Sequence, residues 1–379
     1  MGNVTCGDAK NAGKSRKGAR TCSNRQDAGM DRSFEFTRRA QSRVVVGAGV
    51  ESRLPELLRE LGAGPGAVVV VHDRTMATLA DRVAERLGGA HCLAIPTGEA
   101  AKDLDQVEAA TRALRQLGAD RSSTLLALGG GSVTDFTGFL ASIWLRGVRF
   151  VACPTTTLAL CDASLGGKNG IDVEGRKNEL GTVRQPDLVV GDTDWLATLP
   201  DALWCEGFVE VVKMAAVLDA AHFAVLERLA LALRARDAGA AAKAIEMAIA
   251  MKMAVVLADE TERDRRRWLN FGHTIGHALE THARGALRHG ECVALGMLAE
   301  CRAAAATVPN AVLERLTRLL QDLGAPTAWP RAFADVEALW SLARQDKKAR
   351  ADVVPMIVPA VVGNGVVVEL TKERLAASL

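Results

Sequence analysis

Short runs of aliphatic residues alternate with helical segments through the first half of the chain, and this alternation constrains the fold most. The runs "RVVVGAG" from residue 43, "AVVVVHD" at 67–73, "TLLALGGG" and "FVACPTTT" are separated by segments with helical spacing, such as "TMATLADRVAERLG". Strands without polar alternation are typical of a parallel sheet that helices cover on both faces. The sequence therefore predicts a Rossmann-like α/β domain.

The pattern changes after about residue 196, where long segments rich in Ala, Leu, Glu and Arg dominate. Their spacing predicts helices over residues 201–217, 222–258, 269–283, 290–307 and 310–323, and only residues 352–370 look extended. We therefore expect a nucleotide-binding α/β domain at residues 41–195 and a mostly α-helical domain at 196–379. A cleft between two such domains is the usual place for a ligand.

Residues 1–40 are rich in Gly, Ser, Asn, Lys and Arg and lack hydrophobic periodicity, so we expect a disordered extension. An Arg-rich, acid-poor start could also be an organelle transit peptide, but the apolar face of an amphipathic helix is missing. A start of translation at Met30 is a further alternative.

Composition narrows the class of partner. Hydrophobic residues make up 49% of the chain and the net charge is +2, while residues 1–29 alone carry six Lys/Arg and two Asp/Glu. The rest is therefore nearly neutral, and we expect no nucleic-acid partner. No apolar run approaches the ~20 residues of a membrane span. The eight cysteines form no CxxC pair, which favours reduced thiols in a cytoplasm.

A glycine-rich turn lies between a predicted strand and a predicted helix in "LALGGGSVTDFTG". Gly129, Gly130 and Gly131 would let a pyrophosphate approach the backbone at the helix N-terminus. Thr134 stands where the Rossmann fingerprint has glycine, so a tight turn without a ligand is an equally good interpretation. Asp73, at the end of another strand, either accepts from a ribose hydroxyl or caps the next helix.

Four of the seven histidines lie within residues 273–289, and three of them, His273, His277 and His289, are the candidate ligands. The segment "GHTIGH" lacks the glutamate of the metalloprotease motif, so an acidic ligand would have to come from elsewhere. Glu210 could complete a Glu/His/His site with an open position for substrate, as a catalytic zinc keeps. Its spacing from Lys213 is, however, also typical of a solvated surface pair.

The segment "CDASLGGKNGIDVEGRKNELG" follows a buried strand, where α/β folds place ligands. Its candidate polar side chains are Asp162, Lys168, Lys177 and Asn178. Two lysines and an asparagine can hold a phosphate dianion, although glycine-rich polar loops are often merely solvated. Further cationic groups are Arg146, Lys252 and Arg266. Together they indicate an anionic substrate with more than one charged group.

An ordered series of motifs resembles the 3-dehydroquinate synthase family of sugar-phosphate cyclases. The motifs are "GEAAKDL", "GGGSVTDFTGF", "RGVRFVACPTTTLALCDASLGGKNGID", "RKNELGT", "FVEVVKMA", "NFGHTIGHALE", "HGECVALGM" and "DKK". The resemblance runs from about residue 43 to 370. It implies a Rossmann-like parallel-sheet domain followed by a mostly α-helical domain, and a homodimer.

The resemblance also implies a role for each matching position. The ligands of Zn²⁺ or Co²⁺ would be Glu210, His273 and His289. The NAD-binding residues would be Asp73, Gly98, Glu99, Lys102, Gly130, Gly131, Asp135, Thr155, Thr156, Lys168, Lys177, Trp195 and Thr198. The catalytic residues would be Asp162, Lys168, Lys213, Asn270 and His277, the last beside the departing phosphate. The substrate-binding residues would be Arg146, which would reach the neighbouring subunit's site, Asn178, Lys252, Arg266, Lys347 and Lys348.

The implied activity converts 3-deoxy-D-arabino-heptulosonate 7-phosphate to 3-dehydroquinate and phosphate, a carbon–oxygen lyase reaction of the shikimate pathway. It would proceed by transient oxidation with NAD, β-elimination, re-reduction and intramolecular aldol closure. Lys252 and Arg266 match the pair that holds the substrate carboxylate, which cyclases of neutral sugar phosphates do not need. The alternatives are an aminodehydroquinate or 2-deoxy-scyllo-inosose synthase, a metal-dependent polyol dehydrogenase, and a non-catalytic NAD-binding regulator.

Overall fold

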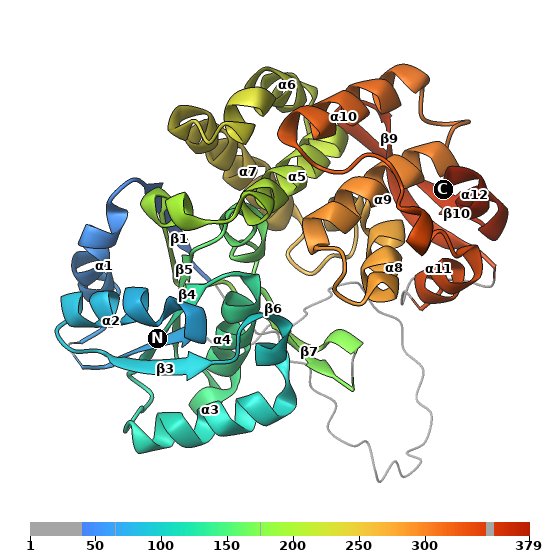
Figure 1. Cartoon of the computed structure of the whole chain (residues 1–379). Helices are drawn as coiled ribbons and strands as arrows, with labels where there is room; N and C mark the ends of the chain where they lie inside the picture. The colour runs from blue at the N-terminus through green and yellow to red at the C-terminus, as the bar shows by residue number, and fades with distance from the viewer. Residues whose placement is uncertain (1–39, 65, 175, 346–351) are drawn as a thin grey trace, which may run out of the picture. The chain divides into compact units, whose positions relative to one another are not determined.

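A six-stranded parallel sheet forms the framework of the first half of the chain in the computed structural model, which describes residues 40–379 except 65, 175 and 346–351 (Figure 1). The strand order is β1-β8-β5-β4-β2-β3. The strands are β1 (Arg43–Gly47), β2 (Val68–Asp73), β3 (His91–Ile95), β4 (Thr124–Gly129), β5 (Arg149–Pro154) and β8 (Leu188–Asp192). The expected disordered extension at residues 1–40 falls, apart from Ala40, outside the described residues, as do Lys347 and Lys348.

Alternate residues of the strands pack against different pairs of helices. Val68 and Val70 of β2 share a core with α1 (Leu54–Glu60) and α2 (Ala77–Arg86). Val69 and Val71 share another with α3 (Leu104–Gln116) and α4 (Gly131–Ile143). Because successive side chains of a strand point to opposite faces, the sheet is covered on both sides. The predicted α/β architecture is confirmed.

The strand order has a switch point between β2 and β4. The chain passes from β2 outward to β3, then crosses back to β4 on the other side of β2 and continues to β5. Ligands of open parallel sheets bind at the carboxyl ends of the strands beside such a switch. Asp73 ends β2 and Gly129 ends β4. These two residues, which the sequence suggested for nucleotide binding, therefore flank the switch point.

The glycine-rich segment after residue 161 is a hairpin, where the sequence favoured a loop. β6 (Lys168–Val173) pairs antiparallel with β7 (Arg176–Val183). Ile171 is buried in the core that contains α4, which anchors the hairpin to the sheet half. A Cβ at Gly181 would lie 2.6 Å from the Asn169 carbonyl oxygen, so glycine permits the close pairing that the polar composition concealed.

The second half is mostly helical, as predicted, and its helices run from yellow-green to red in Figure 1. They are α5 (Asp201–Leu218), α6 (Ala220–Arg234), α7 (Ala238–Ala258), α8 (His273–Ala283), α9 (His289–Ala303), α10 (Asn310–Leu323), α11 (Val336–Ala343) and α12 (Lys372–Ser378). Helix α5 is buried on all sides from Phe208 to Val217, which explains its lack of a polar face. The extended segment near the C-terminus is the antiparallel pair β9 (Val354–Val361) and β10 (Asn364–Leu370).

Two predicted helices are shorter in the structure, for local backbone reasons. The helix expected over 222–258 is interrupted after α6, where Arg236 has φ 62° and Asp237 caps α7 through the Ala240 N–H. The helix expected over 269–283 begins only at His273, because Gly272 has φ 77°. A residue in this left-handed region ends a regular helix.

Residues Ala40–Leu379 form one compact unit, so the domain boundary expected between residues 195 and 196 stays a prediction. Within the part of the chain that the structure describes, none of the helices combines the length and apolar character that a bilayer span requires.

Candidate metal and substrate site

Glu210, His273 and His289 converge from three helices, α5, α8 and α9. One potential ligand atom from each lies within 4.8 Å of the others. His273 Nε2 is 3.7 Å and His289 Nε2 is 3.4 Å from Glu210 Oε1. A carboxylate and two imidazoles held by rigid helices form the type of donor set that binds a catalytic divalent metal.

Glu210 is fully buried, so the surface-pair interpretation of Glu210 and Lys213 is wrong. Lys213 is also buried and forms an ion pair with Glu210. Neither carboxylate oxygen of Glu210 makes a well-oriented hydrogen bond within the described residues. A buried carboxylate is costly unless cations balance its charge; Lys213 supplies one, and a metal at the oxygen that faces the histidines would supply another. This observation fits a metal ligand.

The second nitrogen of each imidazole also has a partner. His273 Nδ1 lies 3.1 Å from the Phe271 carbonyl oxygen, and His289 Nδ1 lies 3.2 Å from Glu280 Oε2. If Nδ1 donates in each case, the lone pair of Nε2 is directed toward Glu210. Metal-binding histidines are commonly oriented by a carbonyl or carboxylate in this way.

The electrostatics of the group favour positive charge. Burial alone would raise the pKa of Glu210, but Lys213 and His273 hold it well below its usual value. Burial, with help from Lys213, lowers the pKa of His273. Burial opposes protonation of His289 too, but the carboxylates of Glu210 and Glu280 raise its pKa to about 10. The group thus contains a persistent anion and a histidine that holds a proton when no metal is bound.

A second possible metal group consists of His277, Glu280 and His289. It would use the side of the His289 ring that faces Glu280. Each carboxylate already pairs with a lysine, Glu280 with Lys177 and Glu210 with Lys213, but Glu210 is fully buried, whereas His277 of the second group is exposed. We therefore favour Glu210, His273 and His289. The exposed ring of His277 lies beside this group, with its centroid 4.9 Å from that of His273.

A set of buried cations adjoins the metal group. Lys252 on α7 pairs with Asp162, which lies in a single turn of π-helix (η5, Ala159–Ala163). Burial, opposed by Asp162, lowers the pKa of Lys252. Arg266 is 2% exposed and donates to the Gly166 carbonyl at 2.8 Å rather than to a carboxylate. The positive charge of Arg266 also helps to lower the pKa of Lys252, so the two buried cations lie within electrostatic reach of each other.

The run of three arginines before Trp268 has one buried member, Arg266. Arg265 stacks over the Trp268 ring at 5.8 Å, and Arg267 donates to the Asp264 carbonyl at 2.8 Å. Arg266, the arginine to which the resemblance gives a role, is thus buried, whereas Arg265 and Arg267 are not.

Lys168 and Asn270 are joined through Glu262. Lys168 forms an ion pair with Glu262, and Asn270 Nδ2 donates to Glu262 Oε1 at 2.7 Å. The β6–β7 hairpin contributes Lys168, and the 3-10 helix η7 (Arg265–Asn270) contributes Asn270. These two predicted catalytic residues therefore share one carboxylate.

The glycine turn matches the dinucleotide hypothesis in its geometry. Gly130 is the N-cap of α4 and offers no side-chain cap. A Cβ at Gly129 would lie 2.5 Å from Val133 Cγ2, and one at Gly130 would lie 3.3 Å from Thr156 Cγ2. Glycine is thus required partly by packing against α4 itself. The uncapped helix end beside the switch point also fits a pyrophosphate.

Several predicted cofactor residues meet around Lys102. Lys102 is 3% exposed; its Nζ lies 3.1 Å from Asp135 Oδ2 and also donates to Asn178. Ser132 Oγ donates to Glu99 Oε1 at 3.3 Å, which brings Glu99 to the start of α4. Asn178, predicted to bind substrate, has φ 52°. Gly98 begins the 3-10 helix η3 (Gly98–Lys102) that carries Glu99 and Lys102.

The remaining predicted cofactor residues follow the carboxyl ends of β2, β5 and β8. Asp73 accepts the Thr75 N–H at 2.8 Å, so the capping interpretation is confirmed, while the ribose contact stays a prediction. Thr155 and Thr156 follow β5. Trp195 and Thr198 lie in η6 (Thr193–Thr198) after β8, and Trp195 Nε1 donates to Glu51 Oε2 at 2.9 Å.

Within this chain, Arg146 lies far from the other candidate site residues. It lies just beyond the C-terminal end of α4, whose thirteen residues place it about 20 Å from the glycine turn. Its side chain is exposed and makes no hydrogen bond or ion pair among the described residues. Leu145 and Arg146 have φ values of 48° and 68°, so the backbone presents this turn in an unfavourable conformation.

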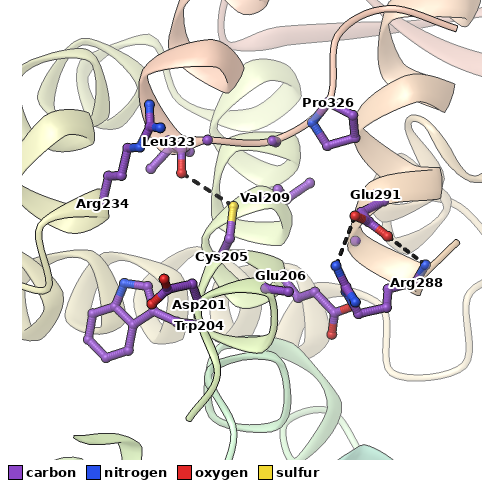
Figure 2. Close-up of a pocket in the computed structure, with 14 residues that line it drawn as sticks. Asp201, Trp204, Cys205, Glu206, Val209, Arg234, Arg288, Glu291, Leu323 and Pro326 are labelled. Atoms are coloured by element: carbon purple, nitrogen blue, oxygen red, sulfur yellow. Dashed lines mark hydrogen bonds and ion pairs between the residues drawn. The ribbon is translucent and has the colours of Figure 1, made fainter.

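A separate cavity of about 330 Å³ lies on another side of α5 (Figure 2). Its wall contains Glu206, one turn before Glu210, and Gly290, next to His289. In Figure 2 the Arg288 and Glu291 side chains pair at its edge, with a shortest distance of 3.0 Å. None of the predicted site residues lines this cavity.

Sequence reasoning missed three carboxylates that organise the site: Glu262, Glu280 and Asp172. Asp172 accepts the Asn178 N–H at 2.7 Å and so stabilises its left-handed backbone. Glu280 lies three residues after His277, a spacing that places both on one helix face and could have revealed it. Glu262 lies in a charged run and gave no comparable signal.

Comparisons with known proteins identify the family of the chain. Residues 92–206 match the 3-dehydroquinate synthase N-terminal family model, and residues 207–349 match the C-terminal one. A 3-dehydroquinate synthase of Geobacillus thermodenitrificans is 37% identical over 358 residues, covering 92% of this chain and 97% of the relative.

Two solved cyclases have a similar fold. The 2-epi-5-epi-valiolone synthase ValA from Streptomyces hygroscopicus subsp. jinggangensis, with NAD⁺ and Zn²⁺ bound, has a TM-score of 0.82 at 27% identity. The comparison covers 91% of this chain and 98% of that one. A 2-deoxy-scyllo-inosose synthase complexed with carbaglucose-6-phosphate, NAD⁺ and Co²⁺ has a TM-score of 0.81 at 25% identity, covering 88% and 95%.

Proposed function

Because the chain belongs to the 3-dehydroquinate synthase family, we propose that it converts 3-deoxy-D-arabino-heptulosonate 7-phosphate to 3-dehydroquinate and phosphate. This makes it a carbon–oxygen lyase of the shikimate pathway. The observation that carries the proposal is the buried pair Lys252 and Arg266 beside the Glu210, His273 and His289 group. A substrate with a carboxylate needs such a cationic pair, and a neutral sugar phosphate does not.

The residues of the site could hold two bound groups, a divalent metal and NAD. Glu210, His273 and His289 would hold a divalent metal, Zn²⁺ or Co²⁺, and the residues at the carboxyl edge of the sheet would hold NAD. When bound, the metal supplies Lewis acidity and NAD supplies reversible hydride transfer at the substrate carbon that bears the oxidised hydroxyl.

The side chains of this chain orient the substrate. Lys252 and Arg266 bind its carboxylate, and burial makes these contacts stronger than they would be in water. Lys168 and Lys177 of the hairpin neutralise the phosphate dianion, and Asn178 and His277 donate hydrogen bonds to it. A phosphate held in this way is a better leaving group, because its developing charge is already compensated.

Lys213, Asn270 and Asp162 fix the remaining polar atoms of the substrate. Lys213 stays cationic: burial opposes its charge, but Glu210 and Asp162 raise its pKa. Its ammonium group can therefore donate hydrogen bonds to the substrate. The contribution of the protein is mainly orientation and preorganised charge.

We further propose a homodimer in which Arg146 completes the site of the partner subunit. Arg146 is exposed and far from its own site, and the large apolar side chains of Ile143 and Leu145 are 44% and 41% exposed beside it. Exposed apolar side chains beside a strained turn are typical of an interface. We place the enzyme in the cytoplasm, because the six cysteines among the described residues are all free thiols.

Separate assays with four substrates test the activity. The purified protein, with NAD and zinc, is offered the phosphorylated heptulosonate, its amino analogue, glucose 6-phosphate and sedoheptulose 7-phosphate. Phosphate release from the heptulosonate without accumulation of NADH is expected. Release only from glucose 6-phosphate or sedoheptulose 7-phosphate would contradict the proposal and favour a secondary-metabolite cyclase.

A further inference from the structure

Glu280 connects a metal-ligand histidine to a lysine of the hairpin. Its Oε2 lies 3.2 Å from His289 Nδ1, and its Oε1 accepts from Lys177 Nζ at 2.8 Å. The Glu280 side chain is 17% exposed and that of Lys177 is 47% exposed, so the contact with His289 is the better shielded from water. One carboxylate therefore serves two residues of the site with different oxygens.

The contact with His289 determines which ring nitrogen is available to a metal. A neutral imidazole has one N–H and one lone pair, and an acceptor at Nδ1 fixes the proton there. The lone pair of Nε2 then points to the side of the ring where Glu210 Oε1 lies, 3.4 Å away. His273 has only the neutral carbonyl of Phe271 in the equivalent position. The two histidines thus differ in the charge of their acceptors, and a carboxylate makes the ligand more basic.

The contact with Lys177 attaches the hairpin to helix α8. Lys177 is 47% exposed, and β7 is mostly exposed, so few packing contacts hold this lysine in place. Ion pairs of this kind are weak when solvated, but Glu280 is fixed on a helix and already oriented by His289. The position of Lys177 is therefore tied to the geometry of the metal group.

We propose that Glu280 is a positioning residue that orients His289 for the metal and holds Lys177 over the substrate phosphate. The inference rests on the proposed function for the identity of the metal and the phosphate. It assigns to Glu280 no contact with the metal itself, because Glu210 occupies the opposite side of the His289 ring.

The test measures the zinc affinity of the metal-free protein by competition with a chromophoric chelator. Glu280→Ala removes the acceptor and is expected to weaken zinc binding about 10–100-fold, as loss of a partner that orients a ligand does. Glu280→Gln keeps an oxygen for the Nδ1–H and is expected to recover most of that loss. Glu291→Gln is the matched control, because Glu291 lies two residues after His289 and pairs with Arg288 instead (Figure 2).

A second arm separates the two contacts of Glu280. Lys177→Met is expected to leave the zinc affinity within about twofold and to raise the KM for the substrate, as loss of a charged contact does. The Co²⁺-substituted Glu280→Gln protein should show a shifted visible absorption spectrum, which a purely structural role would not produce. If Glu280→Ala fails to fold, this spectrum still tests whether Glu280 orients His289.

The outcomes that overturn the inference are specific. Equal zinc affinity in wild type and Glu280→Ala, an unchanged Co²⁺ spectrum in Glu280→Gln, or an equal loss in Glu291→Gln would each contradict the positioning role. A wild-type protein that binds no zinc would refute the proposed metal site instead. The failure of the inference and the failure of the proposed function are thus distinguishable.

Discussion

The carboxylate of Glu300, on α9, accepts the backbone N–H of Gly272 at 2.7 Å, immediately before the metal-ligand helix α8 begins. Its other oxygen accepts the Ile275 N–H at 3.0 Å. The first N–H groups of a helix have no partner within the helix, so the two oxygens of Glu300 satisfy backbone donors that would otherwise lack an acceptor. Glu300 thus fixes the turn that presents His273.

Glu300 should make the stability of the protein depend on pH. Burial raises its pKa to about 8, against the opposing effect of the N–H groups. The folded state therefore binds more protons than the unfolded state between about pH 4.5 and 8, so this contribution falls as pH rises through that window. We expect the melting temperature of wild type minus that of Glu300→Gln to be larger at pH 5 than at pH 8.5. A constant or growing difference would contradict this.

Glu210→Gln should abolish stoichiometric metal binding. The amide cannot supply the negative charge that two imidazoles and a divalent cation require, and Lys213 would lose its buried partner. Elemental analysis of the purified variant should find far less than one zinc per chain. Asp201→Asn, a carboxylate variant at the exposed start of the same helix, is the control and should keep its metal. Full occupancy in Glu210→Gln would exclude this ligand set.

Lys252→Ala should weaken substrate binding and leave the metal in place. A hydrogen bond to a charged group contributes roughly 1.5–3 kcal/mol, so the KM for the heptulosonate phosphate should rise about 10–100-fold. Arg266→Lys tests the same carboxylate, because lysine cannot form the bidentate contact. Steady-state kinetics with zinc analysis check both variants. An unchanged KM in both would remove the basis for choosing a substrate that carries a carboxylate.

Arg146→Ala should be inactive alone but complemented by a second inactive chain. In a dimer of Arg146→Ala with Glu210→Gln, one site has an intact Glu210 and receives Arg146 from the other chain. Random pairing of equal amounts then gives about a quarter of the wild-type activity. Coexpression with two affinity tags allows the mixed dimer to be isolated. Its complete inactivity would show that Arg146 does not act across an interface.

The parts of the fold that follow simple periodicity were predictable from the sequence. The apolar runs of β2, β4 and β5 and the helices α5 and α10 lie close to where the pattern placed them. The hairpin β6–β7 was not, because its glycines and charges match a loop and its pairing depends on close backbone approach. The breaks before α7 and α8 depend on positive φ angles at Arg236 and Gly272, which periodicity does not report.

Residue patterns in the sequence predicted less of the site than of the fold. Spacing pairs His273 with His277, yet the atoms that converge on Glu210 are those of His273 and His289. That grouping depends on the packing of α5, α8 and α9, and it came from the resemblance to a family. The supporting carboxylates Glu280 and Glu300 were missed, because their roles arise only from contacts between helices.

The most direct test of the account is product analysis with the phosphorylated heptulosonate under catalytic NAD and stoichiometric zinc. We expect equal amounts of inorganic phosphate and 3-dehydroquinate, many turnovers for each NAD, and no accumulation of NADH. NADH that accumulates in proportion to substrate consumed, without phosphate release, would identify a simple dehydrogenase and contradict the central claim.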